Sequence, residues 1–341
     1  MHLISIFRRL RVHRTWAYKG PLLMAGPYCV LALSGTPALK ALVAVLASML
    51  TVGGIAGLAY LINDLADQTS DRAAGKSNST EGASPMAIVL AALILLLAAL
   101  LPWATVLPFS GLAGILLGAE LMLFFLYAVP PFRFKERGFL GLATDATYAY
   151  VVPALLAAMT FASIGDLPRG DIAHLLTALV VWQAPLGLRN IILHQIEDSA
   201  NDIASETRTW VLSVGKSRAE RLTRKYIVPL EIGGFVYFCA SVYSVAPAVT
   251  LIYPIFLGLT ILVIKISWRR SLPLSLQESL ILYLSDYYDE WIPVLLLLTL
   301  VACDPMYLPL LLLHLVAFRK NAVRSTLREI GIVAARLRAT P

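Results

Sequence analysis

Three aspartates stand at helical spacing directly after a long apolar run. Asp64, Asp67 and Asp71 occupy positions i, i+3 and i+7, so their carboxylates share one helix face and repel one another. A charged residue near a bilayer costs about 2.5–3.5 kcal/mol on insertion scales, so this first acidic cluster requires a compensating cation. Carboxylate oxygens suit Mg2+, which shares its coordination with water and substrate phosphates, and Asn63 adds a neutral oxygen. A solvated polar loop after a helix end is the alternative.

A second acidic cluster follows another apolar run later in the chain. Asp198, Asp202 and Glu206 are spaced four apart and again share one helix face. Either cluster alone fits a solvated helix end as well as a metal site. Two clusters at equivalent ends of two helices fit a site in which two or more Mg2+ ions clamp a diphosphate between opposed carboxylates. The pairing therefore favours the metal site.

Basic side chains accompany both clusters. Arg72 and Lys76 follow the first cluster and either form surface salt bridges with its carboxylates or contact phosphate oxygens. Arg208 lies between two threonines after the second cluster, and this stretch offers hydroxyl and basic groups suited to phosphate. Arg72, Lys76 and Arg208 are therefore candidate substrate-binding residues.

Two further polar residues lie on the apolar run before the second cluster. His194 stands one turn before Asp198 and either orients that carboxylate or acts as a general base, of which we favour the orienting role. Arg189 lies deeper in the run and faces either a cavity or a structural carboxylate. Both are candidate substrate contacts.

The composition places these clusters in a membrane protein. Of 341 residues, 58% are hydrophobic and 14% are charged, which excludes an ordinary soluble domain. Apolar runs recur along the whole chain, so we predict one domain over residues 1–341, an all-α polytopic bundle of about nine transmembrane helices. The predicted spans are 20–37, 42–62, 86–107, 110–130, 141–163, 174–194, 227–246 and 248–265. A last apolar region, 291–318, contains Asp304 and Pro305 and forms one kinked helix or two short ones.

The Lys and Arg residues fall between these spans and set their orientation. They concentrate in 8–19, 133–137, 208–225 and 265–270, which places these segments on one side, the cytoplasmic side. Both acidic clusters then lie on that side and can meet. We predict that 1–19 is a basic interfacial segment and that 319–341 is an amphipathic basic surface helix. The expected location is the bacterial inner (plasma) membrane.

The formal net charge of +7 is compatible with nucleic acid or with lipid headgroups as partners. Because the basic residues lie in short clusters between apolar runs, we predict membrane lipid and no nucleic acid. Cys29, Cys239 and Cys303 are isolated in or beside apolar segments, so they offer neither a disulfide framework nor metal-ligand spacing.

Three motifs together resemble one family, the UbiA superfamily of intramembrane prenyltransferases. Residues 63–71 match its N-D-x-x-D-x-x-x-D signature and residues 198–202 match its D-x-x-x-D signature. After the fourth span stands a stretch similar to the family's tyrosine, proline and basic segment, with Tyr127, Pro130, Pro131, Arg133, Lys135 and Arg137. The resemblance covers roughly residues 10–270. The chain departs from the family at Asn78-Ser79-Thr80, where an Arg-Pro pair is common, and at Glu206, where a glycine is common.

The resemblance implies a helical bundle around a central cavity, with an isoprenyl diphosphate and Mg2+ at its cytoplasmic mouth. The resemblance also implies which residues act in catalysis: Asp64, Asp67, Asp71, Asp198, Asp202 and Lys135. It implies that the five aspartates, together with Glu206, are the metal ligands. Lys135 binds the diphosphate, and Arg133 and Arg137 supply further counter-charge. Tyr127 and Tyr148 line the cavity near the cleaved carbon. The stretch 286–291 lies outside these signatures and either lines the cavity or caps a helix.

The expected reaction follows from these parts. Metal and basic groups stabilise the charge that develops on the diphosphate as the allylic carbon–oxygen bond ionises, and an unknown lipophilic acceptor, for which an aromatic compound is one candidate, captures the cation. A terpene cyclase on the same scaffold, which needs no acceptor, is the alternative. A cation transporter is a remote alternative, because transporters place such acids near the membrane midplane. A CDP-alcohol phosphotransferase is excluded, since its D-G-x-x-A-R core is missing.

Overall fold

The chain is helical throughout the part that the structure covers. The computed structural model describes residues 3–10, 12, 16, 20–73, 75–168, 170, 172–205, 207–268, 275–318 and 321–339, and every regular element in them is a helix. Seven described stretches are long and apolar enough to cross a membrane: Ala38–Ala66, Pro85–Thr105, Gly111–Ala128, Phe139–Ile164, Ala173–Ala204, Lys216–Val242 and Pro247–Lys265. The predicted all-α polytopic bundle is confirmed.

Local signals set the ends of these helices. Helix α7 (Pro85–Thr105) starts after Ser84, whose Oγ accepts the Ala87 N–H at 3.3 Å. Helix α8 (Gly111–Ala128) starts in the same way after Ser110. Helix α4 (Ala25–Ser34) ends at Gly35, whose φ of 59° is the left-handed conformation of a helix C-terminus.

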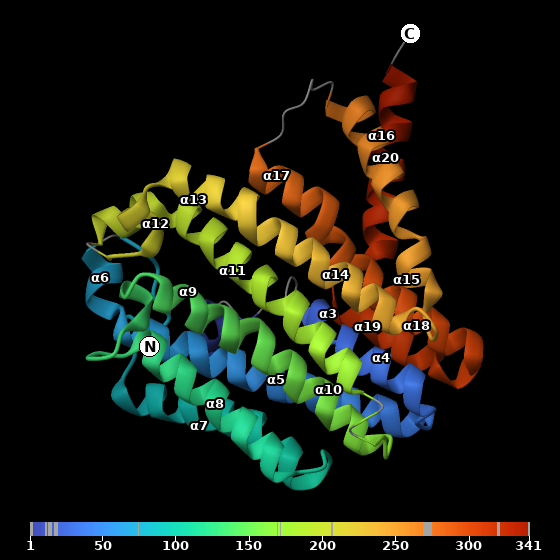
Figure 1. Cartoon of the computed structure of the whole chain (residues 1–341). Helices are drawn as coiled ribbons and strands as arrows, with labels where there is room; N and C mark the ends of the chain where they lie inside the picture. Colours follow the sequence, from blue (N-terminus) through green and yellow to red (C-terminus); the bar gives the residue numbers. More distant parts are fainter. Residues whose placement is uncertain are drawn as a thin grey trace.

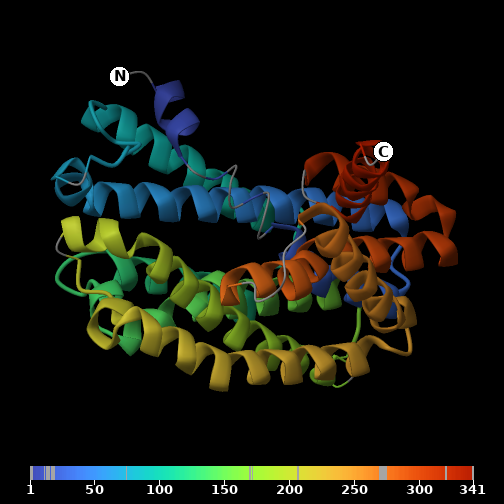
Figure 2. The same cartoon turned by 90° about the horizontal axis from the view of Figure 1, so that it is seen from above.

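Two tightly packed helix pairs form opposite sides of the bundle (Figure 2). On one side α5 (Ala38–Ala66) packs on α7, and on the other α11 (Ala173–Ala204) packs on α14 (Val228–Val242). Glycines permit both close approaches. A Cβ on Gly54 of α5 would lie 2.4 Å from the Ala99 backbone nitrogen, and one on Gly234 of α14 would lie 2.5 Å from the Val181 carbonyl oxygen.

The remaining helices complete the bundle around these pairs (Figure 1). Helix α8 and a continuous helix formed by α9 (Phe139–Ala146), a π-helical turn (Thr147–Val151) and α10 (Val152–Ile164) connect the two sides. The other α-helices in the described residues are α1 (Leu3–Arg9), α3 (Gly20–Leu23), α6 (Gln68–Ala73), α12 (Trp210–Val214), α13 (Lys216–Leu222), α15 (Pro247–Leu251), α16 (Tyr253–Trp268), α17 (Leu276–Leu280), α18 (Ile292–Cys303), α19 (Leu308–Ala317) and α20 (Ala322–Ala339). Helices α6, α12 and α13 gather at the end of the bundle where both acidic clusters lie.

The last apolar region forms two helices. Helix α18 ends at Asp304, whose carboxylate accepts the Met306 N–H at 2.9 Å and opens the next turn. The ten residues of α19 rise about 15 Å, half the thickness of a bilayer core, so α19 does not cross a membrane by its own length. Just before α18, Tyr287 and Tyr288 are fully buried in an aromatic core with Phe235. The stretch 286–291 therefore packs the bundle: no side chain caps α18, and none of these residues lines the cavity described below.

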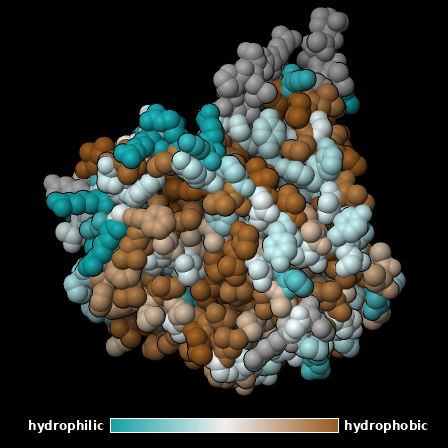
Figure 3. Space-filling view, in the orientation of Figure 1, coloured by the Kyte–Doolittle hydropathy of each residue, from teal (hydrophilic) through white to brown (hydrophobic). Residues whose placement is uncertain are grey.

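The surface agrees with a membrane setting. Figure 3 shows a broad apolar area over the middle of one face, with hydrophilic residues gathered at the end that carries α6, α12 and α13. On α7 the exposed side chains include Leu93, Leu97 and Leu101. Helix α20 runs beside α16, and its apolar residues Val323 and Leu327 are exposed. The interfacial placement of this tail stays a prediction.

Candidate active site

One cavity of about 660 Å3 lies between α5, α8, α10 and α11, within the usual volume range of ligand pockets. The two acidic clusters meet at one end of it, which we call the mouth. The mouth is lined by Asn63, Asp67, Asp71, Lys76, Lys135, His194, Asp198 and Asp202. The prediction that the two clusters share one site agrees with this geometry.

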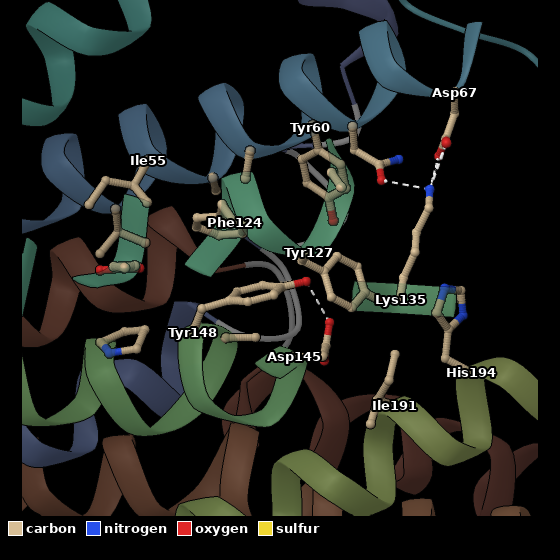
Figure 4. A pocket seen from close by; sticks show the side chains of 18 of the residues that line it. Ile55, Tyr60, Asp67, Phe124, Tyr127, Lys135, Asp145, Tyr148, Ile191 and His194 are labelled. Carbon is tan, nitrogen blue, oxygen red and sulfur yellow. Dashed lines mark hydrogen bonds and ion pairs between the residues drawn. The ribbon is translucent and has the colours of Figure 1, made fainter. Parts of the chain in front are cut away.

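On one wall of the mouth, Asp67 is ion-paired with two basic side chains. Lys135 Nζ donates to the two carboxylate oxygens of Asp67 at 2.6 and 2.5 Å (Figure 4), and Arg133 Nη1 lies 3.2 Å from the same group. Lys135 reaches this position from a short 3-10 turn, Phe134–Glu136. The turn packs closely on α9, because a Cβ on Gly141 would lie 2.6 Å from the Phe134 carbonyl oxygen. Burial lowers the pKa of Lys135, although the Asp67 carboxylate acts in the opposite direction.

Asp64 faces the following loop instead of the cavity. It is 2% exposed, and its Oδ2 accepts the Ser79 N–H at 3.1 Å. Asn78 Nδ2 donates to the Asp64 carbonyl oxygen at 2.6 Å and to Asp71 Oδ2 at 2.8 Å. The Asn78-Ser79-Thr80 segment, which departs from the family pattern, thus holds two of the three acids in place. Burial, together with the neighbouring carboxylates of Asp67 and Asp64, raises the pKa of Asp71.

The second wall is joined to the first by a lysine. Lys76, from the loop after the first cluster, lies 3.4 Å from Asp198 Oδ2, and Asn201 Nδ2 donates to the other Asp198 oxygen at 3.1 Å. Asp202 is buried and lines the cavity one turn further along α11. His194 lines it one turn before Asp198, as its spacing predicts. Glu206 lies outside the described residues.

These acids fit Mg2+ by their chemistry. Four carboxylates on two opposite walls, one from the end of α5, one from α6 and two from α11, offer hard oxygen ligands at the mouth. In the part of the chain that the structure describes, no three Asp, Glu, His or Cys side chains surround one point, and Asp67 and Asp198 are each paired with a lysine. A cation bound by Asp67 or Asp198 would compete with the lysine that is paired with that carboxylate.

Aromatic side chains form the cavity wall below the mouth. The Tyr148 ring lies 4.1 Å from that of Phe124 and 5.3 Å from that of Tyr127, measured between centroids. Tyr148 donates to Asp145 Oδ2 at 2.6 Å (Figure 4). The predicted placement of Tyr127 and Tyr148 in the cavity agrees with this arrangement, whereas Asp145 was missed by sequence reasoning.

Comparison with known proteins identifies this architecture. The sequence matches no protein-family model and no curated protein. The structure is similar to two structures of a UbiA homolog from Archaeoglobus fulgidus, one bound to GPP and Mg2+ and one to DMAPP and Mg2+. Both have a TM-score of 0.54 and cover 85% of this chain and 98% of that one, at 20% and 19% sequence identity. The chain has the UbiA fold. The resemblance inferred from the motifs is therefore confirmed at the level of the fold.

Within this UbiA fold, Arg189 has a structural position. Its guanidinium binds Glu231 of α14 at 2.6 and 3.0 Å and Ser285 at 3.1 Å, and both charged side chains are fully buried. Arg189 and Asp198 are nine residues apart, which places them on opposite faces of α11. Of the two alternatives for Arg189, the structure selects the structural carboxylate, and the candidate substrate contact is not supported.

Three predicted basic residues lie away from the cavity. Arg72, Arg137 and Arg208 are exposed and outside the described residues that line it. Arg137 donates to the Pro131 carbonyl oxygen at 2.8 Å. Of the six basic residues predicted near phosphate, Lys76, Lys135 and Arg133 are therefore the ones whose charges reach the acidic walls.

Two cavity residues outside the motifs could have been predicted from the sequence. Asp145 and Glu120 are single acids within apolar runs, and both are buried and line the cavity. An isolated acid inside a membrane span is expensive and marks a functional position. That rule would have found both residues without a motif.

Proposed function

We propose that the chain is a Mg2+-dependent intramembrane prenyltransferase, which ionises an isoprenyl diphosphate and transfers the prenyl group to a lipophilic acceptor. The observation that carries the proposal is the mouth itself, where acids and lysines from two opposite walls meet above an aromatic cavity. The UbiA homolog of the same fold, solved with GPP and Mg2+, supports the choice of substrate class.

In this proposal the mouth holds the diphosphate and its metal. Asp67 and Asp71 on one wall and Asp198 and Asp202 on the other would hold Mg2+, which neutralises diphosphate charge when bound. Asp64 contributes by fixing the loop that orients Asp71. Glu206 remains a predicted ligand.

The lysines change partners on substrate binding. Lys135 and Lys76, released from Asp67 and Asp198, bind phosphate oxygens and stabilise the leaving diphosphate. As the bond between the first prenyl carbon and oxygen breaks, its electron pair stays with the diphosphate. An allylic cation is left in the cavity.

The cavity wall protects the cation until it reacts. The rings of Tyr127, Tyr148 and Phe124 exclude water and present their faces to positive charge. The acceptor donates an electron pair to the cation, forms the new bond and loses a proton. Tyr148 is held by its hydrogen bond to Asp145, which keeps its ring in this wall.

The proposal includes an orientation. The basic segment 133–137 contacts the mouth, and α12 and α13 lie at the same end of the bundle, which the positive-inside rule places in the cytoplasm, here of a bacterial inner membrane. Residues 1–341 act as one domain, with the 1–19 segment and the 319–341 tail at the membrane surface.

The test compares two neighbouring acids on α11. Asp198→Asn removes a mouth carboxylate, whereas Glu197→Gln changes an exposed one outside the cavity lining and serves as the matched control. The full chain is incubated with geranyl diphosphate, Mg2+, a lipid extract and aromatic acceptors, and products are followed by mass spectrometry. We expect prenylated acceptor from the wild type and the control, with a large loss in Asp198→Asn. Equal turnover in all three would refute the site, and a terpene formed from geranyl diphosphate alone would identify a cyclase.

A further inference from the structure

An unpartnered carboxyl group lies on the cavity wall away from the mouth. Glu120 of α8 is 5% exposed and lines the cavity, and its Oε2 has no hydrogen-bond partner among the described residues. It stands seven residues before Tyr127, so it lies about 10 Å deeper along the helix axis. The proposed diphosphate chemistry gives this group no role.

Glu120 occupies a position where packing alone predicts an apolar residue. The other buried residues of α8 are Ala113, Leu117 and Ala128, which share its buried face. A carboxyl group here is costly when it makes no hydrogen bond. Its presence therefore indicates a partner that enters the cavity.

Other polar side chains also line the inner part of the cavity, the part away from the mouth. Trp103 also lines the cavity, and its indole N–H lacks a hydrogen-bond partner among the described residues. Thr51 and Thr160 line it too, but their hydroxyls already donate to backbone carbonyls at 3.1 and 2.6 Å. The inner cavity thus offers hydrogen-bonding groups within an otherwise apolar wall.

An isoprenyl tail cannot satisfy these groups, because it is a hydrocarbon. A ligand that fills the inner cavity excludes water from Glu120 and must itself supply a hydrogen bond to the carboxyl group. Within the proposed reaction, the molecule able to do so is the acceptor.

We propose that Glu120 is an acceptor-binding residue that hydrogen-bonds a hydroxyl or amine group of a lipophilic acceptor. This inference rests on the proposed prenyl transfer and names the acceptor class: a largely apolar molecule with a hydrogen-bonding group on the side away from the diphosphate. The acceptor then occupies the inner cavity beside the prenyl chain. A pure hydrocarbon acceptor is excluded.

The test uses 1-naphthol and naphthalene as probes, which differ by one hydroxyl group. The unfolding temperature of the full-length chain in one detergent is measured against probe concentration for the wild type, Glu120→Leu and Glu120→Gln. We expect the wild type to bind 1-naphthol more tightly than naphthalene by about tenfold, the worth of one buried hydrogen bond. The preference disappears in Glu120→Leu and is partly kept in Glu120→Gln. If Glu120→Leu does not purify as a folded protein, Glu120→Ala takes its place with the same expectation.

Two controls make the result specific. Phe124→Leu alters the cavity wall on the same helix without removing a polar group, so the preference for 1-naphthol persists. Geranyl diphosphate with Mg2+ must still raise the unfolding temperature of every Glu120 variant, and its failure to do so in the wild type would refute the prenyl diphosphate site instead. Equal binding of both probes by the wild type, or a preference that survives in Glu120→Leu, overturns the role of Glu120.

Discussion

Replacing Lys135 by methionine separates its two roles. In the structure its Nζ donates to both oxygens of Asp67, while in the proposed complex it binds the diphosphate. Lys135→Met should therefore strengthen the binding of Mg2+ alone, because Asp67 no longer has to break this pair. The same change should weaken the binding of a prenyl diphosphate.

The structure sets the size of both effects. The two side chains are 11% and 12% exposed, so their bonds are only partly screened by water. Arg133 at 3.2 Å remains as a partner for Asp67 and limits the gain. A charge-assisted bond is worth about 1.5 kcal/mol at the low end of its range, which corresponds to roughly tenfold in Kd. We expect Mg2+ to bind roughly tenfold more tightly and geranyl diphosphate roughly tenfold more weakly.

Isothermal titration of the purified full chain measures both affinities. Mg2+ is titrated first without substrate, and geranyl diphosphate is then titrated at saturating Mg2+. Lys40→Met is the control, since Lys40 bonds the Ile164 carbonyl at the other end of α5, and it should change neither value. If Lys135→Met weakens Mg2+ binding as well, the lysine does not compete with the metal and the partner exchange is wrong.

Three further predictions concern stability and pH. Glu231→Gln leaves the buried Arg189 charge uncompensated and should lower the free energy of unfolding by about 3–5 kcal/mol. The double variant with Arg189→Met should regain most of this stability, which thermal unfolding measures. Because the pKa of Asp71 is raised and Mg2+ needs its ionised form, Mg2+ affinity should rise as pH increases through that raised pKa and level off above it. A pH series of Mg2+ titrations checks this, and the same slope in Asp71→Asn would contradict it. Gly54→Ala should overpack α5 against α7, lowering the free energy of unfolding by about 1–3 kcal/mol and with it the unfolding temperature. Gly53→Ala, whose Cβ meets open space, should leave both unchanged.

The sequence by itself determined the membrane bundle and the two acidic clusters. Apolar runs of spanning length allow little besides helices, because backbone groups in a bilayer must bond within their own segment. The spacing of Asp198 and Asp202 places them on one face near the end of a helix, and the basic segments predict that both clusters lie on one side. These properties are local or follow from composition, so a single sequence is enough to predict them. The predicted single helix face for the first cluster is wrong, because α5 ends at Ala66 and Asp71 belongs to α6.

Only the tertiary structure decided which partner each polar side chain meets. Helical periodicity assigns a residue to a face, but it does not say which helix covers that face. Arg189 and His194 lie on the same run, yet Arg189 turns to Glu231 and His194 to the cavity. Asp64 accepts a hydrogen bond from a loop whose position no local pattern predicts, and Glu120 lines the cavity because α8 packs beside α5 and α10. Long-range helix packing brings these residues together, and it depends on many small contacts that local patterns do not encode.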